Sequence, residues 1–91
     1  MQIVLSTKFQ KGYKKLHANQ RADLGVAVQA VTGNPSLGVM KKGDLNQTII
    51  YKFKMVGQLT LLAYRITIDG DIVLLLIDFG SHENFYRDLK R

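Results

Sequence analysis

Apolar positions recur at helical spacing in the first third of the chain and alternate with polar ones further on. A first helix should follow a short strand at residues 2–6, with Ser6 or Thr7 as its cap. Its apolar stripe consists of Phe9, Tyr13 and Leu16. A second helix should begin at the cap Asn19 and end at Gly33-Asn34-Pro35. Its stripe consists of Leu24, Ala27, Val28 and Val31.

The second half of the chain has the alternating pattern of strands. A turn at residues 56–58 and the type I′ hairpin signal Asp69-Gly70 separate the alternating segments. The predicted elements are a loop at residues 36–47, strands at 48–55, 59–68 and 72–79, and a short helix at 83–89. This order predicts an α+β fold in which two N-terminal helices pack on one face of a small antiparallel sheet, followed by a short C-terminal helix.

Alternation also predicts which side chains share a face of the sheet. Tyr51, Phe53 and Met55 should face the helices, because the helical stripes need an apolar partner, while Lys52 and Lys54 stay on the open face. In the last strand, without a bulge, one face should carry Leu75, Ile77 and Phe79, and the other Asp78, Gly80 and His82. The residues expected on the open face with the lysines are His82, Arg65, Leu59, Leu61, Leu74 and Leu76.

Composition and charge narrow the class of partner. The 91 residues form one small domain, 1–91, with 13 basic and 7 acidic residues and a net charge of +6. Lys8, Lys11, Lys14 and Lys15 occur among the first twenty residues without any acid. A small basic domain attracts nucleic acid or an acidic protein, although positive charge can also serve solubility alone.

Several classes of chemistry are not indicated. With no cysteine and only two histidines, the sequence predicts neither disulfides nor a metal site. The longest apolar run, residues 72–77, is far shorter than a membrane span, and no signal peptide is visible, so we expect a cytoplasmic protein. The segment Gly38 to Gly43 lacks the ending of a phosphate-binding loop.

The candidate chemistry lies at two strands. A strand that ends at Gly80 and is followed by His82 can hold a titratable group on a rigid support, and Tyr86 follows four residues later. Together with Lys52 and Lys54, this pattern suits phosphodiester chemistry. In the simpler alternative, the lysines are the solvated face of a half-buried strand and the histidine is a surface residue or a cap.

The chain resembles the RelE/ParE superfamily of bacterial toxins from type II toxin–antitoxin pairs over nearly its whole length. The resemblance rests on the order and spacing of short pieces. These are Phe9 with Tyr13-Lys14-Lys15-Leu16, Asn34-Pro35-Ser36-Leu37-Gly38, Gly43-Asp44-Leu45, Tyr51-Lys52-Phe53-Lys54, Leu61-Leu62-Ala63-Tyr64, and Gly80-Ser81-His82-Glu83-Asn84-Phe85-Tyr86. The superfamily fold, two N-terminal helices on a small antiparallel sheet, agrees with the fold predicted from the pattern.

The resemblance implies a metal-independent endoribonuclease without a cofactor that cuts mRNA in the ribosome. Lys52 and Lys54 would hold the scissile phosphate and stabilise its extra charge, His82 would act as acid or base, and Tyr86 would orient a base or the 2′-hydroxyl. The further residues expected to bind RNA are Arg65, Arg87, Lys14, Lys15, Lys41 and Lys42. The implied partners are mRNA, the 70S ribosome and a cognate antitoxin, in a toxin–antitoxin hetero-oligomer.

The sequence departs from the superfamily pattern at two positions. RelE-like members carry an arginine where this chain has Leu61, and YafQ-like members carry one where it has Asp78. Two alternatives therefore stand beside the ribonuclease: a ParE-like toxin that inhibits DNA gyrase, and a catalytically degenerate relative that only binds its antitoxin or RNA.

Overall fold

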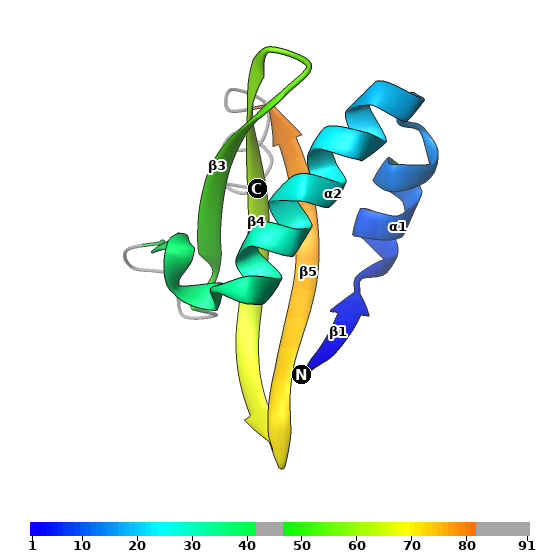
Figure 1. Ribbon diagram of the computed structural model, residues 1–91. Coiled ribbons are helices and arrows are strands. Elements are labelled where there is room, and N and C mark those ends of the chain that lie inside the picture. The colour runs from blue at the N-terminus through cyan, green and yellow to red at the C-terminus, as the bar shows by residue number, and fades with distance from the viewer. Residues whose placement is uncertain (42–46, 82–91) are drawn as a thin grey trace.

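A computed structural model describes residues 1–41 and 47–81 (Figure 1). Strand β1 (Gln2–Leu5) leads into helices α1 (Thr7–Lys14) and α2 (Ala18–Gly33). A 3-10 turn (Pro35–Leu37) and strand β2 (Val39–Met40) follow, and then β3 (Ile49–Met55), β4 (Gln58–Asp69) and β5 (Asp71–Ser81). The prediction of a plain loop at 36–47 missed the 3-10 turn and β2. The predicted helix at 83–89 lies outside the described residues.

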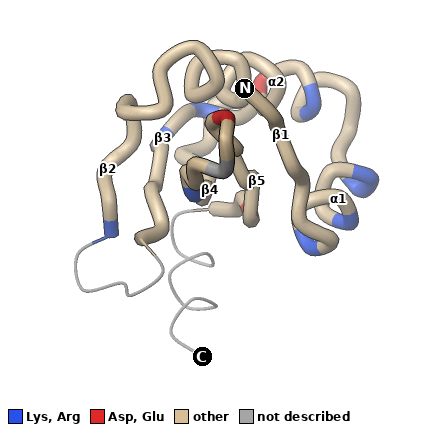
Figure 2. Tube along the Cα trace, turned by 90° about the horizontal axis from the view of Figure 1, so that it is seen from below, with Lys and Arg blue, Asp and Glu red and all other residues tan. Residues whose placement is uncertain are grey.

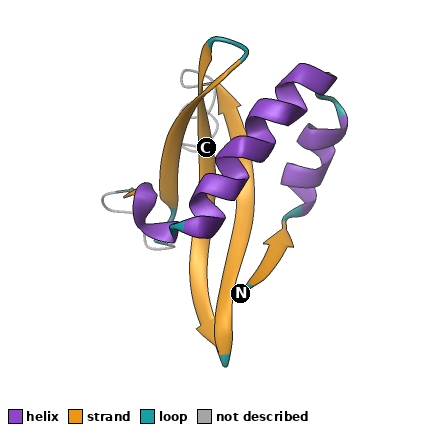
Figure 3. Ribbon diagram, viewed as in Figure 1, coloured by secondary structure: helices purple, strands orange, loops and turns teal. Residues whose placement is uncertain are grey.

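The strands form one five-stranded sheet in the order β1-β5-β4-β3-β2. Neighbours from β2 to β5 are antiparallel, whereas β1 pairs parallel with β5. Both helices cover the same face of the sheet (Figure 3), so the predicted α+β architecture is confirmed. The parallel edge arises because the chain leaves β1 through the helices and reaches β5 only after three antiparallel strands.

Helix α1 begins where the sequence predicts. Ser6 is its N-cap: the Ser6 hydroxyl accepts a hydrogen bond from the Phe9 N–H at 3.0 Å and donates one to the Ile77 carbonyl. Gly12 lowers the helix propensity of α1. Its lack of a side chain leaves room for the Phe79 ring, because a Cβ at this position would lie 3.2 Å from that ring. That ring also packs edge to face on Phe9, with ring centroids 5.2 Å apart.

Helix α2 starts two residues earlier than it would with the predicted cap Asn19. The N-cap is His17, whose N–H donates to the Gln20 side chain at 2.8 Å, and Asn19 lies in the first helical turn. The prediction of Asn19 as the cap is therefore wrong. The Gln20 side chain accepts the hydrogen bond of the His17 N–H, so His17 is the residue at which the helix is capped. The predicted end is confirmed, since Asn34 is the C-cap and Pro35 opens the 3-10 turn.

The main core lies between the helices and the sheet. The predicted stripe of α2 is buried there, with Val28 at its margin, and Tyr51, Phe53 and Met55 pack against the same cluster as predicted. The buried members are Phe9, Leu24, Ala27, Val31, Ile49, Leu62, Tyr64, Leu74 and Leu76. A smaller cluster on the opposite face joins Ile50, Leu61 and Ala63, with Ile77 packed against it.

The predicted faces of the last strand are wrong before residue 78, because β5 contains a β-bulge, whereas Asp78 and Gly80 lie on the face away from the helices as predicted, opposite Ala63 and Leu61. Ala63 pairs with Asp78 but Tyr64 pairs with Leu76, so Ile77 is an extra residue. Leu74 and Leu76 face the helices together with Phe79, while Ile77 packs on the other face. Leu74 and Leu76 are therefore not on the open face, and Leu75 and Ile77 do not share a face with Phe79.

The two-residue type I′ turn lies in the β3–β4 hairpin and not in the β4–β5 hairpin, where the sequence predicts it. Val56 and Gly57 both have positive φ, 51° and 78°, which is the type I′ signature, and Met55 pairs with Gln58. In the other hairpin Asp69 pairs with Asp71 and leaves Gly70 at the tip, so this loop is not the two-residue turn that the sequence predicts. Strand β5 also continues through Gly80 to Ser81 rather than ending at residue 79.

Candidate functional site

The two strand lysines stand side by side on the sheet face away from the helices. Lys52 and Lys54 are exposed, while the side chains between and beside them, Tyr51 and Phe53, turn toward the main core. The rings of Tyr51 and Phe53 are parallel, with centroids 6.4 Å apart. The lysines therefore project from a strand whose opposite face is held by packing, as predicted, and this arrangement places both side chains on one surface.

The sheet register places the end of β5 two strands away from these lysines. Lys52 pairs with Leu61 of β4, and Leu61 pairs with Gly80 of β5. Gly80 precedes the predicted acid or base, His82, by two residues. His82, Tyr86 and Arg87 themselves lie outside the described residues, so their predicted roles stay predictions.

A pocket of about 530 Å³ opens where β2 ends beside β3. Its lining joins the 3-10 turn, β2 and β3 through Leu37, Val39, Met40, Lys41, Ile50, Tyr51 and Lys52. Lys41 is thus brought next to Lys52, while Lys42 lies outside the described residues. The sequence pattern missed this pocket, because a strand of two residues is too short to show alternation.

The other predicted RNA-binding residues lie elsewhere. Arg65 lies on the same side of β4 as Leu61, away from the helices, but it is four residues along the strand, a distance of about 13 Å. Lys14 and Lys15 close helix α1, at the side of the molecule away from β2 (Figure 2). The structure therefore groups Lys41, Lys52 and Lys54, and it separates Arg65, Lys14 and Lys15 from them.

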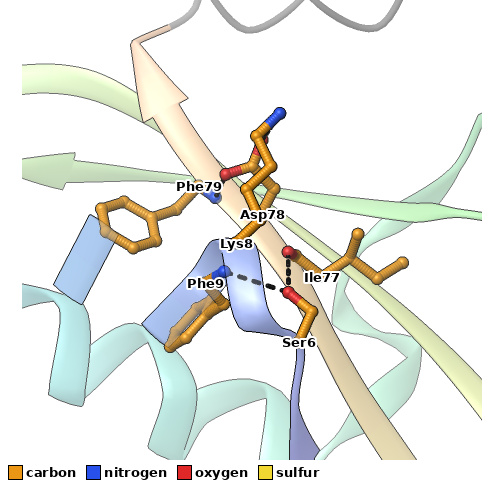
Figure 4. A network of polar contacts seen from close by, with 6 residues as sticks. All are labelled: Ser6, Lys8, Phe9, Ile77, Asp78 and Phe79. Atoms are coloured by element: carbon orange, nitrogen blue, oxygen red, sulfur yellow. Dashed lines mark hydrogen bonds and ion pairs between the residues drawn. The ribbon is translucent and has the colours of Figure 1, made fainter. Parts of the chain in front are cut away.

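Leu61 and Asp78, the two residues that differ from the superfamily pattern, each have specific neighbours in the structure. Leu61 is fully buried in the smaller cluster, where an arginine would lack solvent. Asp78 accepts a hydrogen bond from the Phe79 N–H at 2.8 Å and forms an ion pair of 3.1 Å with Lys8 of α1 (Figure 4). Its carboxylate is therefore neutralised locally by Lys8, a partner that no sequence motif indicated.

Tyr64 is a buried tyrosine of β4 whose hydroxyl contacts the segment just before β2. Its hydroxyl donates to the Pro35 carbonyl at 2.7 Å and accepts from the Gly38 N–H at 3.1 Å. Burial raises the pKa of the Tyr64 hydroxyl above its ordinary value, because the charged form would lose its water. The residue ties the segment before β2 to β4, so it supports the pocket wall and is not a surface acid or base.

Two features are absent from residues 1–41 and 47–81, the part of the chain that the structure describes. No group of three histidine or carboxylate side chains gathers there into a possible metal site. Neither α1 nor α2 has the length and apolar character needed to cross a membrane.

These features define a small α+β domain with a basic strand surface, and comparison with known proteins gives its family. Residues 3–90 match the family described as the ParE-like toxin of the type II bacterial toxin–antitoxin system. The chain therefore belongs to this family of toxins, which confirms the predicted superfamily. No curated protein matches the sequence significantly.

Solved structures agree on the fold. The chain is similar to the toxin in the crystal structure of the intact E. coli RelBE toxin–antitoxin complex, with a TM-score of 0.66 and 23% identity over 88% of this chain and 94% of that chain. It is equally similar to the isolated E. coli RelE toxin, with a TM-score of 0.66 and 23% identity over 99% and 96% of the two chains.

Proposed function

We propose that this toxin is a metal-independent endoribonuclease that cleaves ribosome-bound mRNA in the cytoplasm and is neutralised by a cognate antitoxin. The observation that carries the proposal is the pair of exposed lysines, Lys52 and Lys54, on one face of β3. Two ammonium groups on one surface stabilise the extra negative charge that a phosphodiester gains when the neighbouring 2′-hydroxyl attacks it. The packed strand behind them holds their backbone positions, so both side chains reach the phosphate from the same surface.

The remaining steps of cleavage need an acid and a base. In the proposal His82 transfers the proton to or from the reacting oxygens, and Tyr86 orients the base or the 2′-hydroxyl. Lys41 lies beside Lys52 and extends the phosphate-binding surface, to which we also assign Lys42 and Arg87. Lys14, Lys15 and Arg65 stand apart from this surface, so they contribute to the general attraction of RNA rather than to a contact at the cleaved phosphate.

The antitoxin belongs to the proposal because E. coli RelE, a structural neighbour, is found in a toxin–antitoxin complex. The net charge of +6 favours an acidic partner. The expected assembly is a hetero-oligomer in which the antitoxin covers the basic surface.

Induced expression of the wild type, Lys52→Ala and Lys14→Ala in cells tests the ribonuclease. Primer extension on an abundant transcript should show new 5′ ends within codons for the wild type and for the matched control Lys14→Ala. Lys52→Ala should lose these ends, because removing one charge-stabilising group costs about 10²–10³-fold in rate. Intact transcripts in growth-arrested wild-type cells would exclude the proposal.

A second candidate is inhibition of DNA gyrase without cleavage of nucleic acid. The specific observations that favour it are Leu61, buried where RelE-like members carry arginine, and Asp78, already paired with Lys8. Inhibition of gyrase supercoiling by the purified toxin, with induction of the DNA-damage response and intact mRNA in cells, would select it. Absence of both effects would leave a degenerate relative that only binds.

A further inference from the structure

The sheet ends at strand β1 on the side opposite to β2. In the order β1-β5-β4-β3-β2, β1 has β5 as its single neighbour within the described residues, so its outer edge is unpaired there. Figure 1 shows β1 at this margin of the sheet, with helix α1 beginning beyond the end of the strand. An unpaired edge is a template on which another strand can add.

The outward backbone groups of β1 belong to Ile3 and Leu5. The Ser6 N–H donates to the Leu76 carbonyl at 2.9 Å, so Ser6 directs its backbone toward β5. Every second residue of a strand directs both its N–H and its C=O to the same side, so those of Ile3 and Leu5 point outward. A contact of Gln10 agrees with this direction, since its side-chain amide donates to the Leu5 carbonyl at 3.1 Å.

The side chains along this edge are apolar and uncharged. Ile3, Val4 and Leu5 are 44%, 39% and 41% exposed. Ile3 and Leu5 line an apolar pocket of about 220 Å³ between β1 and the two helices, while Val4 lies on the other face of the sheet. The Met1 ammonium before the strand is paired with the Asp71 carboxylate at 3.1 Å. Strand β1 therefore has no charged side chain with which to select a polyanion or an acidic segment.

We propose that two copies of this chain pair through their β1 strands, antiparallel and related by a two-fold axis at Val4. In this register Ile3 of one copy lies opposite Leu5 of the other, and each such pair exchanges both of its backbone hydrogen bonds. Val4 lies directly opposite Val4 of the second copy. The exposed Gln10 side chain releases the Leu5 carbonyl to this ladder.

The register follows from where β1 begins and ends. A two-fold axis at Leu5 would set Ile3 opposite Thr7, which is already helical. An axis at Ile3 would set Leu5 opposite Met1, whose nitrogen is an ammonium held by Asp71. An axis at Val4 keeps every hydrogen-bonded pair within β1.

This pairing covers the exposed edge of both molecules at once. Ile3 and Leu5 of the two copies form apolar cross-strand pairs on the side of the pocket, and the two Val4 side chains meet on the other face. Because each copy has one β1, a two-fold pair leaves no β1 edge for a third copy. Lys52 and Lys54 stay accessible, since β5 and β4 separate β1 from β3. The inference is therefore independent of the proposed cleavage of RNA.

A single introduced cysteine reports the register directly, because the chain contains no cysteine of its own. Val4→Cys should give a disulfide-linked dimer under mild oxidation, because opposed residues of a non-hydrogen-bonded pair have Cα atoms about 4.5 Å apart, within disulfide reach. In the matched control Gln2→Cys, on the same face, the two cysteines would be about 13 Å apart along the strands and should stay unlinked. Equal yields of linked dimer from the two variants, or none from Val4→Cys, would overturn the inference.

Sedimentation equilibrium of the purified toxin measures the dimer without a cross-link. Val4→Lys sets two like charges opposite each other at the axis and should raise the dissociation constant of the dimer about tenfold or more. Val26→Lys makes the same change at a 67% exposed position of α2 and should leave that constant within about twofold. A cooperative urea transition for each variant shows that it folds. Equal dissociation constants for the two variants would contradict the inference.

Salt provides a further readout. Added salt should strengthen the dimer, because it screens the repulsion between two chains of net charge +6 while the paired edge itself is uncharged. Binding of RNA should weaken under the same conditions. A wild type that stays monomeric at both low and high salt would refute the pairing.

Discussion

The Lys8 ammonium lies 3.1 Å from the Asp78 carboxylate and joins the first turn of α1 to the bulge in β5. Two further contacts lie around this pair, since the Ser6 hydroxyl donates to the Ile77 carbonyl and Asp78 accepts from the Phe79 N–H. The three contacts hold the backbone at residues 77–79, where the bulge reverses the faces of the strand. They therefore fix the direction in which β5 continues to Gly80 and Ser81.

Asp78→Ala should destabilise the protein more than Lys8→Ala. Lys8 is 65% exposed, and an ion pair with such a partner contributes about 0.5 kcal/mol or less after solvent screening. Asp78→Ala also removes the acceptor of the Phe79 N–H, so its cost should reach about 1–2 kcal/mol. Urea unfolding of both single variants and the double variant measures the two contributions. Equal costs would show that the Phe79 contact adds nothing.

Tyr64→Phe should lower stability at neutral pH by about 1–2 kcal/mol, because the Pro35 carbonyl and the Gly38 N–H both lose a partner. The pKa of Tyr64 is raised in the folded state, so its full contribution is present below the unfolded pKa of 10.0 and declines as the pH rises above that value. The wild type should therefore lose stability on going to alkaline pH, and Tyr64→Phe should flatten that decline. Denaturant titrations between neutral and alkaline pH measure both effects, and identical slopes for the two proteins would refute the assignment.

Gly38→Ala should destabilise the junction between the 3-10 turn and β2. An added Cβ would lie 2.6 Å from the Ile49 side chain and 2.8 Å from the Tyr64 hydroxyl, so one of these groups must move. Overpacking of this kind costs about 1–3 kcal/mol. The matched change Gly25→Ala in α2 meets nothing within 4 Å and should instead stabilise the helix by about 0.5–1 kcal/mol. Thermal unfolding of both variants should give shifts of opposite sign.

The salt dependence of RNA binding should separate the lysines of the strand from those of the helix. Removing one phosphate contact lowers the slope of log affinity against log salt by about 0.7 for a single-stranded nucleic acid. Lys54→Ala should show this full loss, whereas Lys14→Ala should change the slope by less, because Lys14 contributes only to the general attraction of RNA. Because Lys54 is exposed, its removal should change the free energy of unfolding by about 0.5 kcal/mol or less. Equal slopes for the two variants would place the RNA on a different surface.

Local sequence patterns correctly predicted most of the secondary structure. They also predicted the part of the candidate site that Lys52 and Lys54 form on β3. The Ser6 cap, the stripe of α2 and the alternation of lysines with aromatics in β3 are each set by neighbours a few residues apart. Such short-range relations persist in any compact fold, because helix and strand periods fix which side chains share a face. The superfamily resemblance, which the match over residues 3–90 confirms, extended these local predictions to the whole chain.

Long-range contacts decided the features that the sequence pattern predicted wrongly or missed. The bulge at Ile77 is held by α1 through Ser6 and Lys8, residues that lie about seventy positions earlier in the chain. The pocket exists because a two-residue strand, recognisable only once it is paired, lies beside β3.

The sequence by itself therefore determined the two helices, the strands other than β2, the α+β class and the face of β3 that carries Lys52 and Lys54. The tertiary structure alone decided the parallel edge of β1, the reversal of faces in β5 and the grouping of Lys41 with Lys52. The physical reason is that periodicity encodes which face of an element is apolar. It does not encode which distant segment will satisfy the backbone groups along its edges.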